Sequence, residues 1–144
     1  MAITNQERVG KAMELLRAGL APYADREFRS VHGERADDAA RRYLGDDRTV
    51  GKKALRDWDV AALLKLMWEA WNEVFGKTLG RAERSLVQEL RDWRNKWAHQ
   101  ELLSSDDADR ALDSMARLLT AVSAPEADEV GKMKMELRRE VFDQ

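Results

Sequence analysis

The sequence predicts an all-α fold, and three observations support this. Only two prolines interrupt its 144 residues. Apolar residues recur at the three- and four-residue spacing of a helix face through most of the chain. No segment shows the alternation of apolar and polar residues that is typical of a strand. Because 44% of the residues are hydrophobic, the chain can build one sizeable core, and we expect one bundle of helices.

The first helix is expected from about residue 5 to residue 31, because apolar residues recur there on one face. These residues are Val9, Met13, Leu16 and Leu20. Asn5 or Thr4 is a suitable N-cap. Pro22 is expected to kink or restart the helix, and His32-Gly33 is expected to end it.

Residues 33–57 are the least regular part of the sequence, because glycines and the pair Asp46-Asp47 interrupt the helical pattern. One short helix is expected within this segment, from Asp37 to Tyr43. The segment is also basic, with Arg41, Arg42, Arg48, Lys52, Lys53 and Arg56. We interpret it either as a solvated loop or as a cationic lip that holds phosphates.

A third helix is expected from Trp58 to Phe75, with Asp59 as its N-cap and Gly76 at its end. Its apolar residues form two stripes and leave a narrow polar strip. One stripe contains Leu63, Leu66, Met67, Ala70 and Val74, and the other contains Leu64, Trp68, Trp71 and Phe75. A helix that is apolar over so much of its circumference must be covered on more than one side. It is therefore either the central core helix or a helix that a second subunit covers.

Three further helices complete the predicted fold. The first spans about Arg81 to Ala98, the second is capped by Ser104 or Ser105, and the third begins at Pro125. Their expected core residues are Leu86, Leu90, Trp93 and Trp97 in the first; Ala108, Ala111, Leu112, Met115, Leu118, Leu119 and Val122 in the second; and Val130, Met133, Leu137 and Val141 in the third. We assign residues 1–124 to the helical domain and residues 125–144 to a C-terminal helix, which is a candidate linker to a missing effector region.

The composition argues against several classes of protein. Cysteine is absent, which excludes disulfides and fits a cytoplasmic location. With only two histidines, a zinc site is not expected, and neither is any other metal or cofactor. No run approaches the roughly 18–20 apolar residues of a membrane span, so no membrane partner is expected. Because the net charge is −2, nucleic acid could be attracted only by a local patch. A DNA-reading helix is disfavoured, since no helix carries a basic face after a short turn.

The segment RDWRNKWAHQ, residues 91–100, places polar side chains beside two tryptophans. On an ideal helical wheel, Asn95 lies opposite the tryptophan stripe, and His99 lies about 40° from Asn95. Arg94 lies on the shoulder between the core and the solvent, about 140° from His99. Within one helix, Arg94 and His99 are therefore too far apart around the axis to grip one phosphate together. Two copies that face each other in a symmetric dimer could supply the pair jointly.

The chemistry available to Arg94, Asn95 and His99 is limited and specific. Histidine can accept or release a proton near neutral pH, and arginine can hold a phosphodiester and neutralise its developing charge. An amide side chain can orient either group. Together they suit cleavage of RNA without metal, in which the 2′-hydroxyl of the substrate attacks the adjacent phosphorus. The residues alone leave another interpretation open, because a histidine at a helix end is often a capping or surface residue.

The stretch DWDVAALLKLMWEAWNEVFGKTLGRAERSLVQELRDWRNKWAHQ resembles the HEPN superfamily of small all-α domains. It is most similar to the subgroup that occurs in transcript-surveillance endoribonucleases and at the N-terminus of large bacterial ATPases linked to phage defence. The resemblance covers roughly residues 5–122. Its most specific part is Arg94-Asn95-Lys96-Trp97-Ala98-His99, an R-x(4–6)-H motif with a polar residue directly after the arginine.

The resemblance implies a bundle of four to five helices plus the C-terminal helix, paired as a two-fold homodimer whose two motifs line one cleft. It also implies a metal-independent endoribonuclease that leaves a 2′,3′-cyclic phosphate and a 5′-hydroxyl. On this basis His99 is the candidate acid or base, Arg94 is the phosphate and transition-state contact, and Asn95 is the orienting residue. The candidate RNA-binding residues are Arg41, Arg42, Lys52, Lys53 and Lys96.

The alternative is a non-catalytic HEPN module of a larger protein, which serves dimerisation or binds RNA or a nucleotide. The intact trio of Arg94, Asn95 and His99 favours the nuclease. The near-neutral charge of the chain and the acidic neighbours Asp92 and Glu101 favour the binding module, since they weaken the attraction for polyanions.

Overall fold

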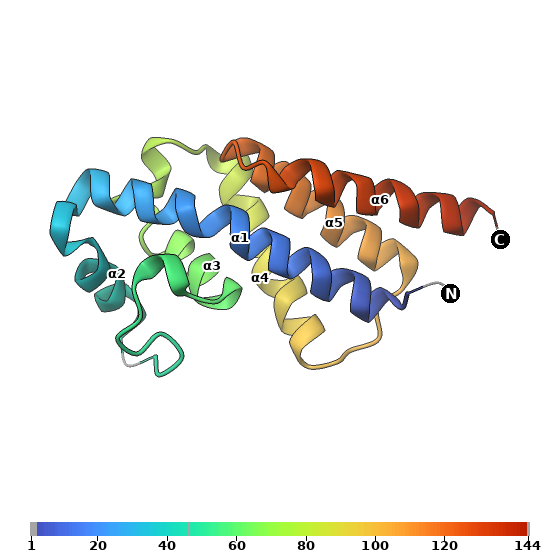
Figure 1. Cartoon of the computed structure of the whole chain (residues 1–144), viewed down its shortest axis with the longest axis horizontal. Helices are drawn as coiled ribbons and strands as arrows, with labels where there is room; N and C mark the ends of the chain where they lie inside the picture. Colours follow the sequence, from blue (N-terminus) through green and yellow to red (C-terminus); the bar gives the residue numbers. More distant parts are fainter. Residues whose placement is uncertain (1–2, 46, 144) are drawn as a thin grey trace.

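The computed structural model describes residues 3–45 and 47–143, and within these ranges it contains helices and no strand. The helices are α1 (Asn5–His32), α2 (Ala36–Leu44), α3 (Val60–Glu69), α4 (Arg81–Ala98), α5 (Ser105–Ala121) and α6 (Glu126–Phe142), with short 3-10 turns at Gly33–Arg35, Leu55–Asp57 and Phe75–Lys77. The predicted all-α bundle is confirmed. Figure 1 shows α1 running almost the whole length of the molecule, with α5 and α6 beside it and α2 at its far end.

The first helix begins as the sequence predicted but does not restart at its proline. Thr4 is the N-cap, and its side chain accepts a hydrogen bond from the Glu7 N–H at 3.0 Å. The helix then continues through Pro22 to His32 as one element. Its apolar face, including Leu16, Leu20 and Phe28, is fully buried. α1 therefore forms the long support against which the other helices pack.

The third helix is shorter than the sequence predicted. Asp59 is its N-cap, as expected, but α3 ends at Glu69 and the chain turns before Phe75. In this turn the N–H groups bond five residues back, from Phe75 to Ala70 at 3.5 Å and from Gly76 to Trp71 at 2.7 Å. A side chain at Gly76 would place its Cβ 2.9 Å from the Trp71 carbonyl oxygen, so this close approach requires glycine. Trp71, Val74 and Phe75 are buried in this turn.

The two apolar stripes of residues 58–75 are covered by the chain itself. Leu63, Leu64, Leu66 and Met67 are fully buried in the common core, which receives side chains from all six helices. Trp68 is half-buried, and the Arg84 guanidinium lies 4.1 Å from the centre of its ring. α3 is therefore the central core helix, and no second subunit is needed to cover it.

The last two helices follow the predicted pattern closely. Ser104 caps α5 in a reciprocal capping box with Asp107. The seven residues expected to face inward from this region are all buried. On α6, Val130 and Leu137 are buried and Met133 is half-buried, whereas Val141 is 47% exposed. The role of residues 125–144 as a linker stays a prediction.

An ion pair between a buried arginine and a partly exposed glutamate fastens α6 to the start of α1. Arg8 is only 3% exposed, and its guanidinium donates to Glu140 at 2.7 Å and to the Asn5 side chain at 2.8 Å. A buried arginine that lacked such partners would be costly, so Arg8 and Glu140 fix the relative position of the two helices. Both chain ends consequently lie at the same end of the bundle (Figure 1). Across the described ranges, every helix is either too short or too polar to pass through a lipid bilayer.

Candidate functional site

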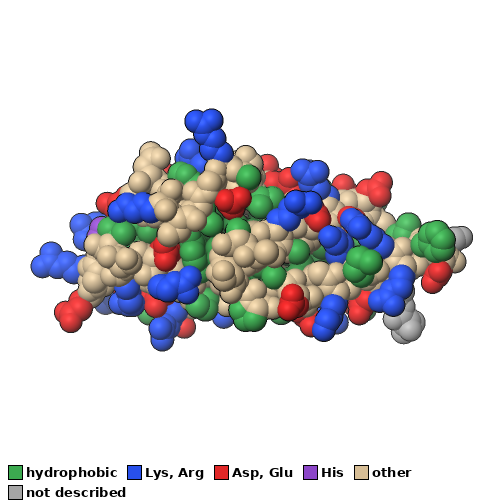
Figure 2. Space-filling view, turned by 90° about the horizontal axis from the view of Figure 1, so that it is seen from above, with side chains coloured by type: hydrophobic (Ala, Val, Ile, Leu, Met, Phe, Trp, Pro, Cys, Tyr) green, Lys and Arg blue, Asp and Glu red, His purple; other side chains and the backbone are tan. Residues whose placement is uncertain are grey.

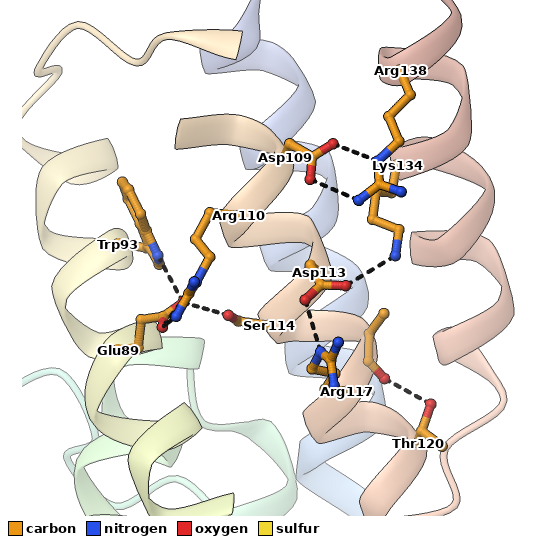
Figure 3. Close-up of polar contacts among 11 residues, drawn as sticks. Glu89, Trp93, Asp109, Arg110, Asp113, Ser114, Arg117, Thr120, Lys134 and Arg138 are labelled. Carbon is orange, nitrogen blue, oxygen red and sulfur yellow. Dashed lines mark hydrogen bonds and ion pairs between the residues drawn. The ribbon is translucent and has the colours of Figure 1, made fainter. Parts of the chain in front are cut away.

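The helix that carries the motif is held to its neighbours by a network of polar side chains (Figure 3). Glu89 of α4 accepts hydrogen bonds from Arg110 at 2.8 Å, from Trp93 at 3.1 Å and from Ser114. The bond from Arg110 contributes most to the lowering of the Glu89 pKa, with smaller contributions from Ser114 and Trp93. Because Arg110 and Ser114 lie on α5, Glu89 connects the two helices directly before the motif begins.

A second carboxylate extends this network from α5 to α6. Asp113 accepts hydrogen bonds from Arg117 at 2.7 Å and from Lys134 at 2.9 Å, as Figure 3 shows. These bonds, the one from Arg117 first, lower the pKa of Asp113. The helices α4, α5 and α6 are thereby joined into one layer beside α1.

The C-terminal end of α4 is held against the first turn of α1. The Gln6 side chain donates to the Trp97 carbonyl at 2.8 Å, and the Trp97 indole donates to the Gln6 carbonyl at 3.1 Å. The Asn5 amide donates to the Leu103 carbonyl at 3.1 Å and holds the loop that follows α4. Trp97, half-buried against the core, is thus the anchor of the motif.

Three residues define how α4 ends. His99 is the C-cap, Gln100 adopts a left-handed conformation with φ of 56°, and the Glu101 N–H bonds back to the Lys96 carbonyl at 3.0 Å. This is a Schellman motif that uses glutamine where glycine is more usual. The His99 side chain is exposed and forms no hydrogen bond to any residue in ranges 3–45 and 47–143. It is therefore available to a ligand or to another chain.

Arg94 and Asn95 line a hollow of about 270 Å³ between the start of α3 and the second half of α4. Its polar lining residues are Asp47, Thr49, Asp59, Lys65, Arg91, Arg94 and Asn95. Arg94 is half-buried, and its Nε atom has no hydrogen-bond partner in the described part of the chain. The Nε atom itself is shut off from solvent, but the guanidinium lines the hollow and makes no ion pair with a described residue, so it is suited to bind an anionic ligand.

The two carboxylates of the hollow are already engaged. Asp47 accepts from the Thr49 hydroxyl at 2.7 Å and from the Thr49 N–H at 2.9 Å, and these bonds lower the Asp47 pKa. Asp59 accepts from the Ala62 N–H at 2.8 Å as the N-cap of α3. Both aspartates therefore serve the local backbone in addition to facing the hollow.

The structure brings together some of the predicted site residues and separates others. Arg94 and Asn95 share the hollow, whereas His99 lies outside its lining. Lys96 is exposed, with its ammonium 4.8 Å from the centre of the Trp93 ring. Lys65 and Arg91 also line the hollow and were not expected there from the sequence, where the signal for Arg91 is its position three residues before Arg94 on the same helix.

The predicted basic lip does not line the hollow. Arg41 donates to the Lys53 carbonyl at 3.0 Å and forms an ion pair with Asp38, so it supports its own loop. Arg42, Lys52 and Lys53 are exposed. Their binding of RNA stays a prediction. Figure 2 shows acidic and basic side chains interspersed over the face that it displays.

Within residues 3–45 and 47–143, no group of three or more histidine, aspartate or glutamate side chains is arranged to hold a metal ion. His32, the second histidine, is occupied elsewhere, because its Nε2 atom lies 2.7 Å from a Glu73 carboxylate oxygen. The hollow thus presents arginine, lysine, amide and two carboxylate side chains, and the His99 imidazole stands outside its lining without a hydrogen bond to a described residue.

The sequence matches the model of one family, described as Swt1-like HEPN, over residues 11–123. This range covers most of the chain and includes the motif of α4. The chain belongs to the Swt1-like HEPN family. The resemblance to HEPN domains is therefore confirmed. No curated protein and no solved structure gave a significant match to the chain.

Proposed function

We propose that this HEPN domain is a metal-independent endoribonuclease whose active site is completed in a two-fold dimer. The observation that carries the proposal is the intact motif at the end of α4. Arg94 and Asn95 line a hollow there, and the side chain of the neighbouring His99 forms no hydrogen bond to a described residue. Membership of the Swt1-like HEPN family supports it, because the resemblance of the motif to that of HEPN domains implies cleavage of RNA without metal.

In the proposed reaction the 2′-hydroxyl oxygen of the RNA attacks the adjacent phosphorus. A bond from this oxygen to phosphorus forms, the bond from phosphorus to the 5′-oxygen breaks, and a 2′,3′-cyclic phosphate results. One imidazole takes the proton of the 2′-hydroxyl, and an imidazole or water gives a proton to the departing 5′-oxygen. His99 supplies this acid–base group, Arg94 neutralises the charge on the phosphoryl oxygens, and Asn95 orients the phosphate.

The dimer is proposed because one chain does not place all three groups in one hollow. Arg94 and Asn95 line the space between α3 and α4, and His99 stands outside that lining at the helix end. In a symmetric pair, His99 of one copy can lie beside Arg94 of the other. A cleft built in this way would gather the arginines of two copies, so that a protein of net charge −2 could bind RNA locally.

The test compares wild type with His99→Ala and Arg94→Ala on a mixture of single-stranded and hairpin RNA in excess EDTA. We expect wild type to cut and to leave 2′,3′-cyclic phosphate ends. Loss of acid–base catalysis should slow His99→Ala by about 10²- to 10⁴-fold. Its helical circular dichroism should be unchanged, because the His99 side chain supports no structure in the described residues.

The matched control is His32→Ala, which removes the other histidine and should cut RNA at the wild-type rate. Equal cleavage by wild type and His99→Ala would contradict the proposed role of His99. Absence of cleavage in both would contradict the nuclease in the form tested.

A second candidate function is a HEPN module that binds RNA or a nucleotide without cutting it. The placement of His99 outside the hollow favours this alternative, as do the exposed acidic neighbours Asp92 and Glu101. Such a module would retain RNA in the same assay and produce no new ends.

A further inference from the structure

Three cationic side chains meet in the hollow, and none of them has an ion-pair partner among the described residues. They are Lys65 of α3 and Arg91 and Arg94 of α4. Most arginines elsewhere in the described ranges do engage carboxylates, as Arg29, Arg110 and Arg138 do. Unpaired cations gathered in one depression are the arrangement that a bound anion would complete.

The balance of charge in the hollow also favours an anion. Its lining has the three cations and two carboxylates, Asp47 and Asp59, and both carboxylates already accept backbone N–H groups. Asp59 caps the first turn of α3, so the N-terminus of this helix attracts an anion only weakly. The attraction for an anion must therefore come from the three cations. Lys65 lies close enough to Asp47 to help lower its pKa, but the two form no ion pair.

The cations come from elements that the fold holds rigidly. Arg91 and Arg94 are three residues apart and therefore share one face of α4. Hydrogen bonds of Trp97 hold the end of this helix, and those of Glu89 hold its middle. Lys65 faces them from the central core helix. Because these backbones are already ordered, a phosphate bound between them costs less conformational entropy than one held by the irregular segment 41–56.

We propose that Lys65 and Arg91 form, together with Arg94, a phosphate-binding subsite that holds the RNA backbone across the start of α3 and the second half of α4. The inference rests on the proposed RNA substrate and extends the proposed site to residues outside the R-N-x-x-x-H motif. Contacts to phosphate position a nucleic acid without reading its sequence. The subsite therefore allows the domain to bind single-stranded RNA of any sequence.

The test measures binding of a labelled single-stranded RNA of about twelve nucleotides. Every protein carries His99→Ala, so that the RNA stays intact, and fluorescence anisotropy is followed at several salt concentrations. The informative variant is Lys65→Gln/Arg91→Gln, which keeps the aliphatic stems and the helix propensity. Its matched control is Lys132→Gln/Arg139→Gln, which removes the same charges from exposed positions on α6.

We expect the hollow variant to bind at least tenfold more weakly than the control. The slope of log affinity against log salt should fall by about 1.4, since each contact to a single-stranded phosphate contributes roughly 0.7. Affinity and slope equal to those of the control would overturn the subsite, and so would the absence of RNA binding by the His99→Ala parent.

The outcomes separate this inference from the proposed nuclease. If wild type cuts RNA and the hollow variant binds it normally, only the subsite is wrong. If the hollow variant loses affinity while wild type leaves RNA uncut in EDTA, the subsite stands and the nuclease is overturned.

Discussion

Glu89 helps to fix the orientation of the helix that carries the motif. Its carboxylate is 25% exposed and accepts donors from Arg110 and Ser114 of α5 and from Trp93, the residue directly before Arg94. Several charge-assisted bonds to one carboxylate stabilise both its ionised form and the helix pair that supplies them.

We expect Glu89→Gln to lower the free energy of unfolding by about 1–3 kcal/mol at neutral pH, because it removes the charge that these donors face. The folded pKa of Glu89 lies below its ordinary value of 4.5. Its contribution to stability is therefore complete above that value and is lost as the pH falls through the folded pKa. Urea unfolding at a series of pH values should show the difference between wild type and variant shrinking below pH 4.5.

The control for this prediction is Glu136→Gln, which changes an exposed carboxylate on α6. It should leave the unfolding free energy almost unchanged. An equal loss of stability in both variants, or a difference that persists at low pH, would contradict the role assigned to Glu89.

Residue spacing located part of the candidate site and missed another part. Arg94, Asn95 and His99 lie within six consecutive residues, so a local pattern was enough to find them. Arg91 lies one turn before Arg94 on the same helix and was within reach of a local pattern, whereas Lys65 faces the hollow from α3 and only tertiary packing brings it there. No single-helix pattern carries that information.

At the scale of elements, the crossing of α1 and α5 depends on the absence of a side chain at Gly19. A Cβ there would clash with the Leu119 side chain and lie 3.0 Å from Ala124. Gly131 on α6 offers the opposite case, because a Cβ at that position would meet nothing within 4 Å. The two glycines therefore allow one substitution to be compared in crowded and open surroundings.

We expect Gly19→Ala to lower the free energy of unfolding by about 1–3 kcal/mol, since the two helices must move apart. Gly131→Ala should raise it by up to about 1 kcal/mol, because alanine has the higher helix propensity. Chemical denaturation of the two variants measures both effects. Changes of the same sign would show that the close approach at Gly19 is not a constraint.

Helices with clear local signals were predicted well, and the one governed by packing was not. Ser104 and Asp107 mark the start of α5 through a capping box that can be read directly from the sequence. The end of α3 has no such mark, because Ala70 to Phe75 continue the apolar periodicity. The chain leaves the helix at Ala70, and Trp71, Val74 and Phe75 are buried in the turn that follows. Periodicity cannot register this, because it indicates that these residues are buried and not how the backbone buries them.

At the scale of the whole molecule, the proposed dimer can be tested by mixing two inactive variants. His99→Ala retains Arg94, and Arg94→Ala retains His99. If each site takes its arginine from one copy and its histidine from the other, a mixed dimer contains one intact site, and the mixture should regain RNA cleavage. Sedimentation should show a mass near twice the 16.5 kDa of the chain at micromolar concentration.

Mixtures of each variant with the wild-type protein give the reference cleavage rate against which this recovery is measured. A mixture that forms mixed dimers and stays inactive would mean that Arg94 and His99 of the same copy act together. A monomer by sedimentation would remove the composite cleft altogether.

The paired hydrogen bonds between Gln6 and Trp97 couple the motions of the first turn of α1 to those of the end of α4. The first turn of a helix is where fraying begins, and local opening of this kind precedes global unfolding. Each opening of the first turn of α1 deprives the Trp97 carbonyl and indole of their partners. The order of the motif is thus coupled to the first turn of α1, and we expect warming to loosen the end of α4 that carries the motif before the bundle melts.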